Sequence, residues 1–443
     1  MGYAQYKELD NSGVTWLQKK PSHWRIKRLK FSTDLINNKV SVEDSPLPYL
    51  GLEHIESWTG RKIDGEISNS EGLASSFITG DVLFGKLRPY LAKVHLAQQD
   101  GLISSEALVV RSKDKLHAEF LKYYMLSRDF INIVDSSTYG SKMPRASWDF
   151  IGNLPVLLPE VEEQKAIARF LDFKTTQIDA LIAKKKSLLN KLAEKRTALI
   201  SNAVTKGLDP TVAMKDSGVA WLGNVPTHWK VIPIKFSLDT PITDGPHSTP
   251  QFYDDGIPFI SAEAVKNDRL DFSRMRGYIS EDDHAIFSKK YKPKFGDVYM
   301  VKSGATTGAV ARVETHEDFN IWSPLAVLRP HEEKSITDYL FYVLKSKPFF
   351  YSVELSWSYG TQQNIGMGVI SNIRMALPPV EEQQEICQYL EPLLQKIEDQ
   401  REKINTVLDR LKEYRSTLIT NAVTGKIDVR NFEMPQPAEG FAL

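Results

Sequence analysis

Two loops of this sequence carry side chains that are well suited to contact the edges of nucleic-acid bases. The stretches TYGSKMPRASW (138–148) and SYGTQQNIGMG (358–368) share an aromatic–Gly–hydroxyl pattern and then differ. Amide side chains can present a donor and an acceptor to adenine, whereas Lys and Arg can address guanine or phosphate. The side chains concerned are Tyr139, Lys142 and Arg145 in the first loop and Tyr359, Gln362, Gln363 and Asn364 in the second. The alternative interpretation is that both stretches are ordinary polar loop tips.

Signatures of catalysis are absent from the sequence. It contains no GxxxxGK[ST] phosphate loop, no GxGxxG, no HExxH and no CxxC, and its nine histidines are scattered. His23 and His228 each precede a tryptophan in a loop, so we interpret them as structural. Cys387 falls on the apolar face of a predicted helix and is expected to be a buried thiol. We therefore expect no catalytic residue and no metal site in this chain.

The segments that follow the two loops are nearly identical. The motif VEEQ occurs at 161–164 and again at 380–383. The phrase LISNAVTKGLD (199–209) returns as LITNAVTGKID (418–428) at the same spacing from VEEQ. Two long segments that align without a gap indicate that one unit has been copied.

The repeat extends beyond these helical segments. SGVTWLQKKPSHW opens the first half and SGVAWLGNVPTHW the second, and GDVLFGKLRPYLAKV (80–94) faces GDVYMVKSGATTGAVARV (296–313). Within the helical segments, Arg196 is matched by Arg415. The chain is therefore a tandem duplication that reads globular, helical, globular, helical, which amounts to an internal pseudo-dimer.

Periodicity predicts a long helix in each copy. Apolar residues in 162–205 recur every three or four positions, and the segment 165–206 contains neither glycine nor proline. In the second copy, Pro392 is expected to kink or restart the helix, because proline lacks the donor that the preceding turn needs. The first apolar stripe is interrupted by Lys174, Lys185 and Lys195, at the positions where the second has Leu393, Ile404 and Tyr414. We predict an antiparallel coiled coil with lysine stems along the seam; two separate amphipathic helices are the alternative.

Composition and charge narrow the class of protein. The 443 residues carry 56 Lys and Arg against 56 Asp and Glu, so only an uneven charge distribution would favour a nucleic-acid partner. The segment 165–206 has ten basic against three acidic residues, which could follow a phosphate backbone, dock on an acidic partner or simply be solvated. A single cysteine fits a reducing compartment. Neither a signal peptide nor an apolar stretch long enough to span a membrane is seen, so we expect a cytoplasmic protein.

The expected fold class is mixed α+β, with two globular α/β domains separated by two long helices. The short apolar strands are broken by Gly, Pro and Asp, as in GDVLF and EALVVR. The expected segments are a first globular domain at 1–160, a central helical region at 161–209, a second globular domain at 210–379, a C-terminal helical region at 380–428 and a tail at 429–443.

The paired VEEQ and NAVT segments resemble the specificity subunit of type I restriction–modification systems. LPEVEEQKAIARFLD, LPPVEEQQEICQYL and SGVAWLGNVPTHW carry the resemblance over essentially the whole chain, and YGTQQNIG resembles the family's target-recognition domains. The first-half loop, YGSKMPR, departs from the usual Gln- and Asn-rich form.

The resemblance implies a non-catalytic DNA reader. Each globular domain would read one half of a bipartite, non-palindromic site in double-stranded DNA. The helices would set the half-site spacing and bind two methyltransferase subunits, and motor–nuclease (restriction) subunits would join the complex. This chain would hold no cofactor, since S-adenosylmethionine, ATP and Mg²⁺ would be used by the partner subunits.

The resemblance also extends the set of candidate site residues. In addition to the loop residues above, we expect DNA contacts from Lys86, Arg88, Lys302, Ser303 and Thr306. We expect partner contacts from Glu162, Glu163, Gln164, Asn202, Thr205, Glu381, Glu382, Gln383, Asn421 and Thr424.

Two rival functions remain at the level of sequence. One is an interaction scaffold that does not read DNA, which salt-dependent, sequence-selective DNA binding would exclude. The other is a self-sufficient nuclease or methyltransferase, for which the sequence offers no motif.

Overall fold

A computed structural model describes residues 3–65, 72–140, 142–355 and 364–434. The chain forms two compact units, of which unit 1 comprises Met1–Lys186 and Asn405–Leu443 and unit 2 comprises Ser187–Ile404. Each unit therefore combines one globular region with a segment of each long helix. Over the ranges described, no helix is long and apolar enough to cross a membrane.

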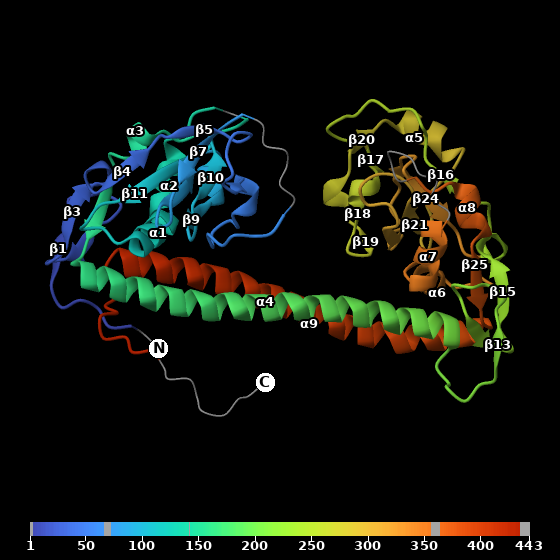
Figure 1. Cartoon of the computed structure of the whole chain (residues 1–443). Coiled ribbons are helices and arrows are strands. Elements are labelled where there is room, and N and C mark those ends of the chain that lie inside the picture. Colours follow the sequence, from blue (N-terminus) through green and yellow to red (C-terminus); the bar gives the residue numbers. More distant parts are fainter. Residues whose placement is uncertain (1–2, 66–71, 141, 356–363, 435–443) are drawn as a thin grey trace. The chain divides into compact units, whose positions relative to one another are not determined.

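The globular portion of unit 1, called the first globular region, is built on two four-stranded sheets (Figure 1). One sheet has the order β4 (Thr33–Ile36), β11 (Ala107–Ser112), β8 (Val82–Gly85) and β9 (Val94–Leu96), and all neighbours are antiparallel. The other has the order β5 (Lys39–Ser41), β7 (Leu73–Phe77), β10 (Gly101–Ser104) and β6 (Tyr49–Leu50), with β6 parallel to β10. Strand β8 is buried along its whole length, which explains its unbroken apolar sequence VLFG.

Among the residues described, three α-helices and two strand pairs add to the sheets of the first globular region. The helices are α1 (Ala118–Leu126), α2 (Arg128–Ser136) and α3 (Trp148–Ile151). Strand β12 (Pro155–Leu158) leads into the long helix and pairs with β3 (Arg25–Arg28), while β1 (Leu9–Asn11) pairs with β2 (Lys19–Pro21). The aromatic stripe of α1 is core, because Phe120, Tyr123 and Tyr124 are buried.

The globular portion of unit 2, called the second globular region, repeats the strand order β4–β11–β8–β9 of the first globular region in its main sheet. Its main sheet has the order β16 (Thr243–Asp244), β24 (Leu325–Leu328), β21 (Val298–Val301) and β22 (Val310–Arg312). A further sheet has the order β20 (Gly277–Ile279), β17 (Ile257–Ile260) and β23 (Asn320–Ile321), with β17 parallel to β23 as β6 is to β10. A hairpin joins β18 (Val265–Lys266) to β19 (Arg269–Leu270).

The strand pairs that flank the second globular region also have counterparts in the first. Strand β25 (Arg374–Leu377) pairs with β15 (Lys230–Pro233), and β13 (Met214–Asp216) pairs with β14 (Asn224–Pro226). The helices are α5 (Glu281–Ser288), α6 (Thr337–Leu344), α7 (Lys347–Leu355) and α8 (Met367–Asn372). The duplication read from the sequence is thus also a duplication of strand order in the main sheet, whereas the second sheet differs between the two regions.

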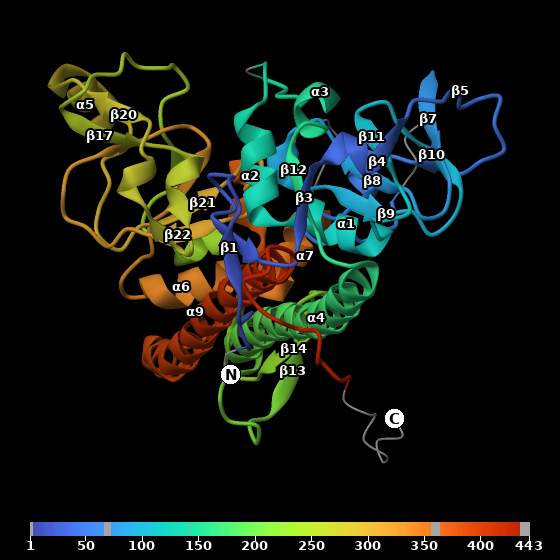
Figure 2. The same cartoon turned by 90° about the vertical axis from the view of Figure 1, so that its left-hand side faces the viewer.

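The two long helices are α4 (Val161–Lys206) and α9 (Val380–Val423), and both take part in each unit. In unit 1, residues near the start of α4, such as Phe170 and Ile178, share a hydrophobic core with Leu418 and Val423 near the end of α9. Figure 2 shows α1 and the sheet β4–β11–β8–β9 of this unit lying over α4.

In unit 2 the core combines the end of α4 with the start of α9, through Ile200 and Val204 on the first helix and Ile386 and Leu390 on the second. The start of each helix therefore packs with the end of the other. The predicted antiparallel pairing is confirmed.

Two details of the helical prediction need correction. Helix α9 runs through Pro392 without a break, because proline removes one hydrogen bond from a helix that many others hold, and its ring lies on the exposed side. The apolar seam is also narrower than expected. Leu181 and Tyr414 are each 47% exposed, and Lys195 is exposed and does not line the seam.

Candidate nucleic-acid interface and helix anchors

In unit 1 the structure joins the two segments that carry candidate DNA contacts. The backbone N–H of Arg88 donates to Pro144 O at 2.8 Å, and that of Ala146 donates to Lys86 O at 3.0 Å. Tyr139 and Arg145 exchange backbone hydrogen bonds of 3.2 and 3.1 Å. The loop after β8 and the loop before α3 therefore form one surface, which we call site 1.

Site 1 contains both exposed side chains and a side chain that is held by an ion pair. Arg88 and Lys142 are exposed, and Tyr139 is 64% exposed, so all three are free to meet a ligand. Arg145 is restrained, because its guanidinium donates to both carboxylate oxygens of Glu106, at 2.9 and 3.2 Å. The hydrogen bond to Glu106 raises the pKa of Arg145.

Sequence reasoning missed two residues of site 1, Glu106 and Lys39. Glu106 accepts from Lys86 through its backbone oxygen at 2.9 Å, in addition to holding Arg145. Burial lowers the pKa of Lys39, and the nearby charge of Lys86 lowers it further. No signal in the sequence links these residues to the two loops, since the pairing arises only when the strands assemble.

In unit 2 the equivalent segments also meet, and we call this surface site 2. Ser303 pairs with Asn364 in a backbone bridge, and the N–H of Ile365 donates to Lys302 O at 2.7 Å. Thr306 and Asn364 are exposed. The predictions for Tyr359, Gln362 and Gln363 lie outside the described residues.

The charges of site 2 converge on a buried carboxylate that sequence reasoning also missed. Asp244 is 1% exposed and lies 2.5 Å from Lys290 Nζ, 3.2 Å from Lys302 Nζ and 3.2 Å from His247 Nε2. Burial alone would raise the pKa of Asp244, but hydrogen bonds from Lys290 and Lys302 outweigh it and hold the pKa below 3.8. Lys302, only 13% exposed, therefore serves first to neutralise Asp244.

The two sites share a backbone frame and differ in side chains. The N–H of Lys86 donates to Glu106 O at 2.9 Å, and the N–H of its counterpart Lys302 donates to Pro324 O at 2.8 Å. Both sites contain the equivalent backbone bridge, Leu87–Arg145 in site 1 and Ser303–Asn364 in site 2. The side chains differ, because Arg145 pairs with Glu106 in site 1 whereas Lys302 pairs with Asp244 in site 2. The same scaffold thus presents two different sets of donors and acceptors.

The glutamines of the two VEEQ motifs anchor the helices to the globular regions. Gln164 is fully buried, accepts from the N–H of His117 at 2.8 Å and donates to the carbonyls of Lys115 and Pro159, both at 2.9 Å. Gln383 repeats this pattern with the N–H of Ile336 and the carbonyls of Lys334 and Pro378. Neither side chain has surface left for a partner, which corrects their assignment as partner-binding residues.

The glutamates before these glutamines hold the segments that open each half. Glu163 accepts from Tyr6 Oη at 2.7 Å and from Trp24 Nε1 at 3.1 Å, and its other oxygen lies 2.9 Å from His23 Nε2. Burial and the hydrogen bond to Glu163 both raise the pKa of Tyr6.

Glu382 repeats the arrangement of Glu163. It accepts from Trp229 Nε1 at 3.0 Å and lies 2.8 Å from His228 Nε2. The structural role predicted for the two histidines is confirmed. The prediction that Glu163 binds a partner is corrected as for the glutamines, because its side chain is only 8% exposed. Glu382 keeps some exposed surface.

The other predicted partner residues divide by exposure. Thr205 and Thr424 are buried, and each hydroxyl donates to a helix carbonyl four residues earlier, so their assignment as partner-binding residues is also corrected. The residues that keep exposed surface are Glu162, Asn202, Glu381 and, to a lesser extent, Asn421. These four stay predictions.

Within the ranges that the structure describes, no group of three or more His, Cys, Asp or Glu side chains is placed to hold a metal ion. Sites 1 and 2 are built from exposed cations, hydroxyls and amides around restrained charges. Such surfaces present hydrogen-bond donors, hydrogen-bond acceptors and positive charge to a ligand.

Both globular regions match a known protein family. A family model described as "Type I restriction modification DNA specificity domain" matches residues 48–192 and 240–409. The type I restriction enzyme MjaVIII specificity subunit of Methanocaldococcus jannaschii is 24% identical over 427 residues, covering 93% of this chain and 94% of that protein. The EcoDI specificity subunit of Escherichia coli is 31% identical over 153 residues, 34% of each chain.

Among solved structures, one chain has a TM-score of 0.68 at 20% identity, and the match covers 91% of this chain and 98% of that one. Its structure is titled as the structural basis underlying complex assembly and conformational transition of the type I R-M system. The family model covers well over half of the chain. The protein therefore belongs to the family of type I restriction–modification DNA specificity proteins.

Proposed function

We propose that this chain is the DNA-specificity subunit of a type I restriction–modification complex. Each globular region reads one half of a bipartite, non-palindromic site, site 1 for one half and site 2 for the other. The observation that carries the proposal is the shared backbone frame with different side chains, because a symmetric dimer of one reader could address only a palindrome. A duplicated chain whose readers have diverged can address two different half-sites.

The chemistry of the two sites supports direct reading of bases. Exposed cations such as Arg88 and Lys142 suit phosphate and guanine, and the exposed amide of Asn364 suits adenine. The guanidinium of Arg145 forms two hydrogen bonds with Glu106 and would therefore present its remaining N–H groups in a fixed direction.

The duplicated helices support the binding of two identical methyltransferase subunits. Glu162 and Glu381 are equivalent and both exposed. Leu188 and Val407 occupy equivalent positions of α4 and α9, and they are 41% and 38% exposed. A repeated acidic and apolar surface is what two copies of one partner need. Restriction subunits join this assembly, and S-adenosylmethionine, ATP and Mg²⁺ are used by the partners.

The proposal is tested by mapping methylated adenine in a genome with and without this chain. We expect one bipartite motif, with two unlike halves and a fixed gap, to lose methylation when the chain is removed. An unchanged map would refute the proposal and favour the interaction scaffold.

A binding assay separates the two sites. Purified complex carrying Lys142→Ala should lose affinity for duplexes in a salt-dependent manner, and Asn364→Ala should relax selection in the other half-site. Lys115→Ala is the matched control, because Lys115 is an exposed lysine of the first globular region outside both loops. Equal losses for the Lys142 and Lys115 variants would contradict the assignment of site 1.

A further inference from the structure

Each globular region presents one tight turn to an arginine of a long helix. In unit 2 the turn joins β18 to β19 through Asn267 and Asp268, whose φ angles of 50° and 67° give the left-handed backbone of a two-residue hairpin. The carboxylate of Asp268 accepts from Arg196 on α4 and from Lys345 at the end of α6. The turn is thereby tied both to its own domain and to the helix.

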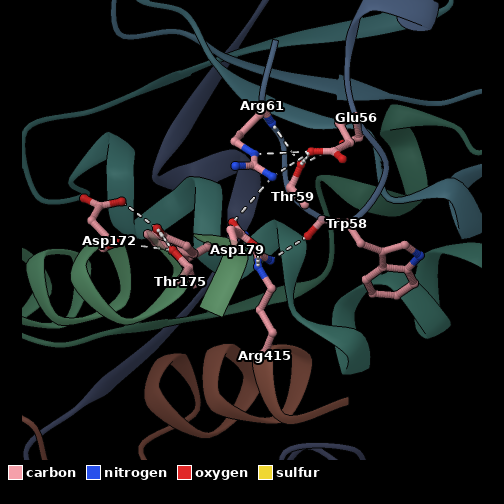
Figure 3. Close-up of polar contacts among 9 residues, drawn as sticks. Glu56, Trp58, Thr59, Arg61, Asp172, Thr175, Asp179 and Arg415 are labelled. Atoms are coloured by element: carbon pink, nitrogen blue, oxygen red, sulfur yellow. Dashed lines mark hydrogen bonds and ion pairs between the residues drawn. The ribbon is translucent and has the colours of Figure 1, made fainter. Parts of the chain in front are cut away.

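In unit 1 the corresponding turn spans 56–61, between the paired residues Ile55 and Lys62. It follows a short 3₁₀ helix and a strand in the same order as in the second globular region. Trp58 has a φ of 65°, and its carbonyl accepts from Arg415 Nη1 on α9 at 2.8 Å (Figure 3).

Arg415 also ties the two helices of unit 1 together. Its guanidinium donates to both oxygens of Asp179 on α4, at 3.0 and 3.3 Å (Figure 3). The Arg415 and Asp179 side chains are only 8% and 7% exposed, so water screens the pair little. Arg61 of the same turn reaches Asp179 at 3.9 Å.

The two arginines occupy equivalent positions of the repeat, and each lies on the helix that follows the opposite globular region. The first globular region continues directly into α4 but is held by Arg415 of α9. The second continues into α9 but is held by Arg196 of α4. Each globular region therefore has two attachments, one covalent at the start of its own helix and one polar on the other helix.

We propose that Arg196 and Arg415 are positioning residues that fix the orientation of each reader on the helix pair, and so set how strictly the gap between half-sites is measured. A globular region attached to the helix pair at one point can rotate about that point, whereas a second attachment prevents this rotation. The inference rests on the proposed function, since a gap has meaning only if both halves are read. It assigns no DNA contact to either arginine.

The test is a competition binding assay with the assembled complex. The duplexes carry both half-sites at the native gap, or at a gap one base pair longer or shorter. Arg196→Ala is the preferred variant, because Lys345 still pairs with Asp268 and leaves no uncompensated buried charge. We expect the preference for the native gap to fall by about tenfold, the size of one charge-assisted hydrogen bond, while the preferred bases stay the same.

Arg401→Ala is the matched control, since Arg401 pairs only with Glu398 on its own helix among the contacts described. Arg196→Lys should restore some of the preference, because lysine keeps the charge without the planar fork. Hydrogen–deuterium exchange at 265–270 in the free chain should be faster in Arg196→Ala than in the control.

The outcomes distinguish this inference from the proposed function. If Arg196→Ala keeps the wild-type preference for the native gap and its hydrogen exchange at 265–270 is unchanged, the inference is overturned and the proposed function remains intact. Absence of sequence-selective binding by the wild-type complex overturns the proposed function itself. If Arg196→Ala does not fold, Arg415→Lys provides the same comparison in unit 1.

Discussion

The buried glutamine of the first VEEQ motif is predicted to be among the most sensitive positions of the chain. Replacing Gln164 by alanine removes three hydrogen bonds and leaves the N–H of His117 and the carbonyls of Lys115 and Pro159 without these partners. The exposed Gln177, on the same helix, is the matched control.

The expected magnitude follows from the number of groups left unpaired. Each buried polar group that loses its partner costs about 1–3 kcal/mol, so the loss of three partners in Gln164→Ala should lower the free energy of unfolding of unit 1 by roughly 3–9 kcal/mol. Gln177→Ala should change it by less than about 0.5 kcal/mol. Gln164→Glu should be at least as damaging as alanine, because a carboxylate cannot donate to the two carbonyls.

Equilibrium urea unfolding, followed by far-ultraviolet circular dichroism, measures the loss. Hydrogen exchange at 115–117 should rise in the same variant, because this segment is tied to α4 through Gln164. A destabilisation of Gln164→Ala as small as that of the control would refute the anchoring role. The repeat offers an independent check, since Gln383→Ala should behave alike in unit 2.

Cys387, Asp244 and the paired long helices each lead to a further measurable outcome. Burial raises the pKa of Cys387 to about 12, so a thiol reagent should not label it at neutral pH until the chain is unfolded; rapid labelling of folded protein would contradict this. The pKa of Asp244 lies below 3.8 because of Lys290 and Lys302, so its contribution to stability is present above that pH and lost as pH falls through the lowered value. The free energy of unfolding, measured over an acid pH series, should therefore fall less steeply with decreasing pH in Asp244→Asn than in wild type. Equal slopes in the two proteins would refute the assignment. Deleting the chain from Val380 onward should leave the apolar face of α4 uncovered and the fragment prone to aggregate, whereas a stable monomer in sedimentation would argue against pairing.

The sequence predicted the helices well because their signal is long and regular. The segment expected at 162–205 is helical over Val161–Lys206, and the repeat indicated the second helix at the corresponding place. The restart expected as one outcome at Pro392 was wrong, since the rule for an isolated proline ignores the packing that holds the rest of α9. The prediction that Lys195 lines the seam was wrong, because the apolar stripe shifts gradually around the helix and its sequence does not show which side packs against the other helix.

The role of the VEEQ motif could not be read from its sequence. The partners of Gln164 and Gln383 are backbone groups of the globular regions, which carry no residue-type signature. The family resemblance suggested an external partner for the repeated motif, whereas the structure shows that its glutamines form an internal anchor that is repeated just as faithfully. The two loops were recognised from their polar residues, but Glu106 and Asp244 entered the sites only through strand pairing.

An exchange of one reader tests most directly the claim that two diverged readers share one duplicated scaffold. The residues between β15 and β25 would be replaced by the corresponding segment of a related protein, with both long helices kept. Mapping of methylated adenine should then show a new sequence in one half-site, with the other half and the gap unchanged. A change in both halves, or in neither, would contradict the account.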